Sequence, residues 1–206
     1  MRKRSFYETI FNFWPPWSDV LLIVLLMLIL YIFVQFIGYS SATIDELVVV
    51  RRKQVQLEEE IKREFEKDYQ NDIGISRDGN LQKITFSDKI LFGLGKSELK
   101  EEGEIVLSRI GLILKKNQFY KSIQVEGHTD NLPITGRLKL RYPSNWELSS
   151  ARATSVVRYM QDNVGLAPKL LSATGYSEYQ PVVENKDEKS RSLNRRIELV
   201  LVYTTY

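Results

Sequence analysis

An uninterrupted apolar run near the N-terminus dominates the hydropathy pattern of this chain. Residues 20–37 read VLLIVLLMLILYIFVQFI, and Gln35 is their only strongly polar member. As a helix rising about 1.5 Å per residue, such a run is long enough to cross a hydrocarbon layer of roughly 30 Å. The pattern predicts a transmembrane helix over residues 18–40, preceded by a cytoplasmic stub and interfacial entry over residues 1–17.

A mostly charged segment with helical spacing follows over residues 41–72. Acid-before-base pairs four residues apart, such as Glu58 with Lys62, suit an exposed helix. A partial apolar stripe runs along the same segment. Its members are Val50, Leu57, Ile61, Phe65 and Tyr69. The segment is predicted to be a linker helix, and we expect its stripe to bring two copies of the chain together.

From about Gly74 the pattern changes to short strands alternating with helices. Such alternation predicts a single two-layer α/β domain over residues 73–206, built from about 130 residues. Strands are predicted over residues 81–86, 122–126, 170–174 and 195–203, and helices over residues 98–116 and 146–163.

Composition narrows the function classes. The chain has no cysteine and one histidine, His128, which excludes a disulfide framework, a thiolate site and a metal site built on several histidines of one chain. A net charge of +3 with 27% charged residues is too balanced to indicate nucleic-acid binding. The basic residues 2–4 orient the short N-terminus toward the cytoplasm, although residues 51–53 are basic too. The apolar run lacks the cleavage site of a signal peptide.

Asp19 stands at the start of the apolar run and allows two interpretations. Pro15, Pro16 and Ser18 suit the first turn of a helix, where a negative charge favours the helix dipole. If the aromatic stretch of residues 11–17 extends the buried length instead, Asp19 lies within the membrane, where a carboxylate is costly and marks function. The local sequence leaves both open.

Four separated blocks in the C-terminal domain carry a family resemblance. They are GHTDN at 127–131, SNWELSSARA at 144–153, ATGYSEYQPVVEN at 173–185 and NRRIEL at 194–199. In this order they resemble the OmpA-like peptidoglycan-binding domain, and the wording around Pro143–Glu147 is similar to the flagellar stator B subunit, MotB. The chain departs from the family in its basic stretch at 136–142 and in Ser177, where many relatives have glycine.

The resemblance implies a peptidoglycan-binding site. A stem peptide of peptidoglycan presents a diamino acid with ammonium and carboxylate ends, which a fixed carboxylate and an arginine can bind. Asp130 and Arg152 match the family positions that do so, and both are expected on an open pocket, where their removal would weaken binding more than stability. The other matching positions are Thr129, Asn145, Leu148 and Arg196.

The stator resemblance also implies a role for Asp19. It matches the aspartate that carries the transported ion, H⁺ or Na⁺, and no cofactor is expected. The implied partners are a multi-pass MotA-like subunit in a 5:2 complex, a second copy of this chain and peptidoglycan. The implied location is the bacterial inner membrane, with the C-terminal domain in the periplasm. In the usual stator pattern this aspartate follows Tyr-Ala and precedes a threonine, and Asp19 has neither neighbour. The sequence therefore does not decide which ion is transported, or whether the machine is flagellar, gliding or a Zorya-type anti-phage system.

Three other interpretations are weighed. The first is a static membrane-tethered peptidoglycan anchor with Asp19 as a helix-capping residue, and the second is a sensor of wall state. The third is a hydrolase using His128 with Asp130 and Ser149, but no G-x-S-x-G motif supports it, and no catalytic residue is predicted. Within the stator interpretation, Ile44–Val50 is a candidate plug of the ion path, and a simple spacer helix is its alternative.

Overall fold

The computed structural model describes residues 14–65, 68–69 and 72–203. The chain divides into two compact units, Met1–Leu47 and Val48–Tyr206. The basic residues 2–4, on which the predicted orientation rests, lie outside the described residues.

The first unit consists of the N-terminal part of helix α1 (Trp14–Phe65). Within it, residues Trp17–Ser40 form a stretch of 24 residues that contains an 18-residue window with a mean hydropathy of 3.1. At about 1.5 Å per residue this stretch is about 36 Å long, enough to cross a membrane. Its apolar side chains are exposed within the chain itself, as expected of a helix that contacts lipid or a partner. The predicted N-terminal apolar helix is therefore confirmed.

Asp19 does not lie at the start of this helix. Helix α1 begins at Trp14, and its first turn contains no acidic residue. Since a turn takes 3.6 residues, Asp19 lies in the second turn, beyond the amide groups that a capping side chain reaches. Pro15 and Pro16 are in the first turn, where the missing amide hydrogen costs little. This geometry weighs against the capping interpretation of Asp19.

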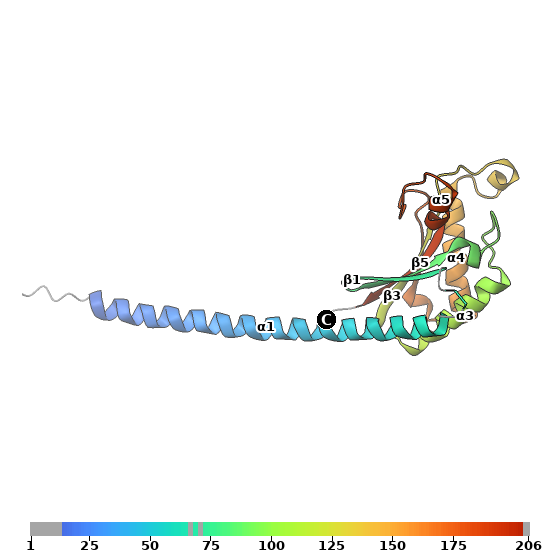
Figure 1. Cartoon of the computed structure of the whole chain (residues 1–206). Coiled ribbons are helices and arrows are strands. Elements are labelled where there is room, and N and C mark those ends of the chain that lie inside the picture. The colour runs from blue at the N-terminus through green and yellow to red at the C-terminus, as the bar shows by residue number, and fades with distance from the viewer. Residues whose placement is uncertain (1–13, 66–67, 70–71, 204–206) are drawn as a thin grey trace, which may run out of the picture. The chain divides into compact units, whose positions relative to one another are not determined.

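The second unit contains a five-stranded sheet in the order β1-β2-β5-β3-β4. Neighbouring strands are antiparallel, except that β3 and β4 are parallel. The strands are β1 (Ile73–Asp78), β2 (Leu81–Ser87), β3 (Tyr120–His128), β4 (Leu171–Gly175) and β5 (Arg196–Tyr203). In Figure 1 the strands lie beside α3 and α4, and α5 lies at one end of the sheet. The predicted α/β domain and four of its strands are confirmed.

One face of the sheet carries the hydrophobic core. Alternate residues of β5, such as Ile197 and Leu199, join side chains from the long helices in one buried cluster. The helices of this layer are α3 (Glu101–Lys116), α4 (Asn145–Asp162) and the part of α1 that belongs to the second unit. The short helices α2 (Asp88–Leu91), η1 (Gly136–Leu140), η2 (Pro168–Leu170) and α5 (Glu188–Asn194) complete the unit.

The apolar stripe of the linker helix packs differently from the sequence prediction. Leu57, Ile61 and Phe65 are only 2%, 1% and 3% exposed, and they belong to the core of the same chain. The expectation that these side chains pair two copies is therefore wrong, because the sheet and α3 already cover them. The last turns of α1 are a structural part of the second unit.

Hydrogen bonds of buried side chains also hold the C-terminal part of α1 against the sheet. Gln54 is fully buried and donates from Nε2 to the carbonyl oxygen of Gly79 at 3.2 Å. Gln82 donates to the carbonyl oxygen of Gln54 at 2.9 Å and accepts from the hydroxyl of Tyr203 at 2.7 Å. Because the NH2 groups of both buried amides donate to backbone carbonyl oxygens, this network fixes the register of the helix on the sheet.

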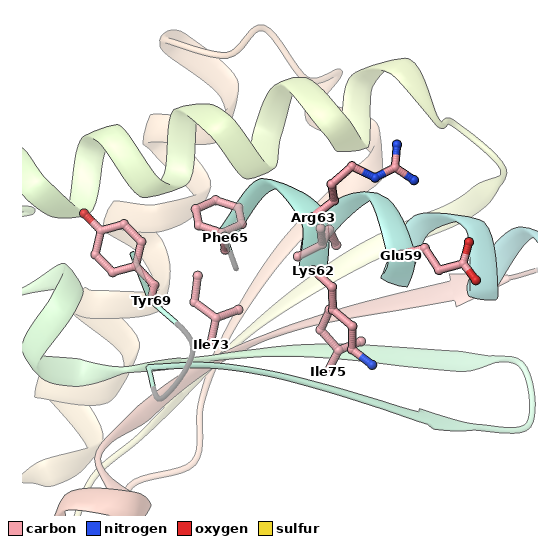
Figure 2. Close-up of a pocket in the computed structure, with 8 residues that line it drawn as sticks. Glu59, Lys62, Arg63, Phe65, Tyr69, Ile73 and Ile75 are labelled. Carbon is pink, nitrogen blue, oxygen red and sulfur yellow. The ribbon is translucent and has the colours of Figure 1, made fainter. Parts of the chain in front are cut away.

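A cavity of about 490 Å³ remains beside the end of α1. Figure 2 shows Phe65 and Tyr69 on one side and Ile73 and Ile75 of β1 on the other. Arg109 of α3 lies over the ring of Phe65, with its guanidinium carbon 4.5 Å from the ring centre. This cavity contains none of the site residues predicted from the sequence.

Candidate ligand-binding site

The candidate site forms at one edge of the sheet, where several strand ends meet. The register pairs Ser87 and His128 with Arg196, so β2 and β3 end where β5 begins. Strand β4 ends at the same edge, because Gly127 pairs with Gly175. Residues just outside these strand ends are therefore neighbours in space although they are distant in the sequence.

Two glycines bring α4 unusually close to this edge. A Cβ atom on Gly127 would stand 2.2 Å from the carbonyl oxygen of Ser149. A Cβ atom on Gly175 would stand 2.6 Å from the backbone nitrogen of Ser150. Since real Cβ atoms do not approach other atoms so closely, only glycine permits this packing. The first turns of α4 are thereby fixed against β3 and β4.

A capping box sets the start of α4. The amide nitrogen of Ser144 donates to Glu147 Oε2 at 2.7 Å, and Ser144 Oγ accepts from the amide of Trp146 at 3.2 Å. This arrangement satisfies amide groups that the helix itself leaves free. Part of the SNWELS block is thus a structural signal that positions Asn145 in the first turn.

Asn145 connects α4 to the loop after β3. Its side-chain amide donates to the carbonyl oxygens of Asp130 and Leu132 at 3.2 and 3.0 Å, and to Glu178 Oε2 at 3.1 Å. Asp130 Oδ1 accepts from the amide of Leu132 at 3.1 Å. The loop is therefore held in one conformation, with the Asp130 carboxylate fixed at the edge of the sheet.

Arg152 pairs with an acid that sequence reasoning did not identify. Its Nη1 lies 3.0 Å from Oδ1 of Asp88, the first residue of α2, and its Nε donates to the carbonyl oxygen of Lys96 at 2.9 Å. The guanidinium also lies over the ring of Phe92, 5.2 Å from its centre. Asp88 Oδ1 is buried without a well-aligned hydrogen bond, so it retains the capacity to accept one.

Burial shifts the pKa values of this pair. It raises the pKa of the Asp88 carboxyl, and Arg152 and Arg195 only partly oppose the rise. It also lowers the pKa of the Arg152 guanidinium, which nevertheless stays charged at neutral pH. The Asp88–Arg152 pair is therefore a charged pair taken largely out of water.

Arg195 completes the cluster from the residue before β5. Its Nη1 donates to Asp130 Oδ2 at 2.6 Å, and its Nη2 donates to Glu188 Oε1 at 2.6 Å. Burial lowers the pKa of Arg195, but the bonds to these carboxylates outweigh it and the net shift is upward. A cavity of about 190 Å³ is lined by Asp88, Arg195 and their neighbours Lys89, Phe92 and Leu94. Its size suits a short polar group rather than a large ligand.

The six predicted residues separate into two groups. Thr129, Asp130, Asn145, Leu148 and Arg152 lie together on the loop after β3 and on α4. Arg196 lies apart from them. It alternates with Ile197 along β5, so its side chain is on the sheet face opposite α4, where its Nε donates to Glu198 Oε1 at 2.6 Å.

The expectation of an open pocket for Asp130 and Arg152 is wrong. Asp130 is 6% exposed and Arg152 is 3% exposed, because each is covered by its partner of opposite charge. The more accessible members of the cluster are Asp88 and Arg195, with side chains 16% and 27% exposed. The doublet of arginines in the NRRIEL block could have suggested Arg195, whereas nothing in the sequence around Asp88 marks it.

His128 does not form a catalytic pair with Ser149. Ser149 Oγ donates to the carbonyl oxygen of Trp146 and accepts from the amide of Ser177, at 3.1 Å each. The His128 ring stacks on Tyr176, and among the described residues neither of its nitrogens has a hydrogen-bond partner. Ser177 has a φ of 54°, a left-handed conformation that glycine adopts more readily.

One cluster in this region has the residue types of a metal site. Single ligand atoms from Glu126, His128 and Glu198 lie within 4.8 Å of one another. Arg196 and Lys83 already pair with Glu198. Burial raises the pKa of Glu198, but these two cations outweigh it and hold the pKa below its usual value. Glu198 is thus already balanced by two cations of the protein.

Comparison with known proteins agrees with this architecture. Residues 91–195, just over half of the chain, match the OmpA family. The chain belongs to this family. The match includes most of the charged cluster, whereas Asp88 and Arg196 lie just outside it.

Similarity to individual proteins extends to a motility protein and to a Zorya protein. The chain is 38% identical to Motility protein B of Bacillus subtilis over 58% of its own length and 44% of the relative's. It is 26% identical to the Zorya protein ZorB of Escherichia coli over 92% of its own length and 87% of the relative's. The chain thus spans less than half the length of the Bacillus relatives that it matches, but most of the length of ZorB.

Solved structures give the same fold. A MotB-like protein from Desulfovibrio vulgaris matches with a TM-score of 0.69 and 27% identity, over 77% of this chain and 99% of that one. The cell wall anchor of the type VI secretion system from Pseudomonas aeruginosa matches with a TM-score of 0.61 and 30% identity, over 70% of this chain and 95% of that one. The chain is therefore MotB-like, with an N-terminal apolar helix and an OmpA-like domain.

Proposed function

We propose that this chain is the peptidoglycan-anchoring, ion-conducting stator subunit of a MotAB-like rotary motor. The observation that carries the proposal is the combination of two features in one chain. One is helix α1, whose apolar stretch Trp17–Ser40 contains one acid, Asp19, in the second turn of the helix. The other is an OmpA-family domain with a buried cluster of two carboxylates and two guanidinium groups.

The charged cluster suits a zwitterionic ligand such as the diamino acid of a peptidoglycan stem peptide. Its ammonium group would bind the carboxylate of Asp88, which lines the cavity and whose side chain is 16% exposed, and would be attracted by Asp130. Its carboxylate would be bound by Arg195, whose side chain is more accessible than that of Arg152. Asp130 and Arg152 then act mainly by holding Arg195 and Asp88 in place.

The membrane helix supports an ion-carrying role for Asp19. A carboxylate is costly in hydrocarbon, so it is retained there chiefly where it has a function, and it must face protein or water. A single helix cannot enclose a path for an ion, and the exposed side chains of residues 17–39 are consistent with packing against a multi-pass MotA-like partner. Two copies of this chain inside a ring of five partners would provide that path for H⁺ or Na⁺.

The location follows from the same features. The chain would cross the inner membrane once, with its N-terminus in the cytoplasm and its OmpA-family domain in the periplasm. Because the match to ZorB extends along nearly the whole chain, whereas the match to Motility protein B covers 58% of it, we assign the chain to a compact Zorya-type motor rather than to a flagellum.

An Asp19→Asn exchange tests the motor role. The amide keeps the size of the carboxylate but cannot carry a proton or balance a sodium ion. We expect the variant to insert and to assemble with its partner but to lose motor output and ion flux. The measurements are the activity of the parent machine and ion flux in membranes that contain both subunits. Full activity of Asp19→Asn would instead support a static membrane-tethered anchor.

A further inference from the structure

Two aromatic side chains form an exposed stack next to the charged cluster. Trp146 of α4 and Tyr179 of the loop after β4 have ring centres 5.4 Å apart and planes inclined by 28°. Trp146 is 46% exposed and Tyr179 is 66% exposed. Each ring is therefore covered on one side by the other while much of the pair faces solvent, a costly arrangement for large apolar surfaces.

The stack is directly connected to the candidate site through Asn145. Asn145 precedes Trp146 in the first turn of α4, and its side-chain amide bonds to the carbonyl oxygen of Asp130 at 3.2 Å. The same amide bonds to Glu178, the residue before Tyr179, at 3.1 Å. Leu132, another partner of this amide, is 50% exposed and adds to the apolar surface. The aromatic surface and the charged cluster are thus two parts of one continuous region.

The chemistry of peptidoglycan indicates what would cover this surface. In a stem peptide, the diamino acid is the third residue from the sugar that carries the peptide. Three extended residues span roughly 10 Å. A diamino acid bound at Asp88 and Arg195 therefore brings its sugar to within about this distance of the cluster, and Asn145 connects the cluster to Trp146.

We infer that Trp146 and Tyr179 form a platform for a sugar ring of the glycan strand, adjoining the stem-peptide site. This inference rests on the proposed peptidoglycan binding and extends it from the peptide to the glycan. A pyranose ring presents a face of C–H groups, and aromatic rings present faces of negative charge density, so the two stack favourably. Both rings lose little side-chain freedom on binding because they already hold each other.

The test compares two soluble ligands on the full chain. One is a stem tripeptide ending in meso-diaminopimelate, and the other is the same tripeptide on its disaccharide. The chain is kept in a detergent without a sugar headgroup, because such a headgroup would compete for the platform. We expect the disaccharide-tripeptide to bind about three- to tenfold more tightly than the tripeptide. In Tyr179→Ala this difference disappears, while the affinity for the tripeptide is unchanged.

Phe119→Ala is the matched control. Phe119 is an aromatic residue 55% exposed, and it precedes β3 at the end opposite the site, roughly 30 Å away at about 3.3 Å per residue. Its removal should leave both affinities unchanged. Thermal unfolding of each variant verifies that the domain is folded.

The outcomes separate this inference from the proposed function. Equal affinities of the wild type for the two ligands would overturn the platform and would leave its surface to a protein partner. A loss of both affinities together in Tyr179→Ala would also overturn it, because the stack would then only hold the loop on α4. Tyr179-dependent binding of the disaccharide-tripeptide without binding of the tripeptide would support the platform and refute the stem-peptide site. If neither ligand binds, the stem-peptide site and the sugar platform are both refuted.

Discussion

Arg152→Ala should destabilise the OmpA-family domain strongly, although the arginine was predicted to lie on an open pocket. The exchange removes the ion pair with Asp88 at 3.0 Å, the hydrogen bond to Lys96 and the contact with Phe92. Removing one partner of a buried pair costs about 3–5 kcal/mol, because the remaining charge stays buried. The pair is poorly aligned, so we expect about 3–4 kcal/mol.

Thermal unfolding followed by circular dichroism measures this effect. For a domain of this size, each kcal/mol lowers the Tm by about 2–4 °C, so we expect a decrease of about 10 °C at pH 7. Arg158→Ala is the matched control, since Arg158 is an exposed arginine on the same helix. Its exchange should change the unfolding free energy by less than about 0.5 kcal/mol.

The pH dependence of this loss of stability tests whether the unpaired charge of Asp88 causes it. Burial raises the pKa of Asp88, so the folded state binds this proton more tightly than the unfolded chain does. The Asp88 carboxyl therefore lowers the free energy of unfolding as the pH rises above the usual pKa of an aspartate. This loss of stability grows until the pH passes the pKa of Asp88 in the folded state. Without Arg152 that pKa rises further, and the loss of stability in Arg152→Ala should be smaller near pH 5 than at pH 7.

A second exchange provides the decisive comparison. Adding Asp88→Asn to Arg152→Ala removes the unpaired charge and should restore much of the lost stability at pH 7. A Tm of Arg152→Ala within 1 °C of the wild type would refute the reasoning. An equal loss at both pH values, without recovery in the double variant, would show that packing rather than charge was responsible.

Three further predictions follow from the fold and from the proposed motor. A fragment of residues 48–206 should unfold cooperatively, whereas a fragment of residues 72–206 should lose several kcal/mol of stability in a denaturant titration, because it lacks the buried end of α1. Equal stability of the two fragments would contradict this. Gly127→Ala should lower the free energy of unfolding by about 1–3 kcal/mol and weaken co-sedimentation of the chain with peptidoglycan, because the added Cβ would displace α4. Wild-type stability and binding of this variant would show that the helix can shift freely. If residues 41–50 are a plug, their deletion should cause an ion leak and slow growth when the chain is co-expressed with its partner. Adding Asp19→Asn to the deletion should cancel the leak. An unchanged membrane potential after the deletion would favour the spacer helix.

Several features of this protein were readable from the sequence because they depend on local pattern. The apolar run of residues 20–37 predicted the N-terminal helix, since hydropathy and length alone decide whether a helix can span a membrane. Strand β5 was predicted because Ile197, Leu199 and Leu201 alternate with residues of the other sheet face. The order of the four sequence blocks identified the OmpA-like domain.

Other features depended on which segments meet in space. Strand β1 was not predicted, because its alternation is weak and its stability comes from pairing with β2. The stripe of Leu57, Ile61 and Phe65 has the spacing that would suit either a second copy or the chain's own sheet, and only the tertiary structure shows that it packs on the sheet.

The residues of the candidate site also divide into those that the sequence indicated and those that only the tertiary structure revealed. The sequence by itself pointed to Asp130 and Arg152 as candidates, because they lie in blocks whose order is diagnostic of the family. Only the tertiary structure added Asp88 and Arg195 and separated Arg196. The ends of β2, β3 and β4 and the start of β5 meet at one edge of the sheet, and residues there approach each other from positions up to about a hundred apart in the chain. Ion pairing across such distances depends on strand order and register, which no local sequence pattern encodes.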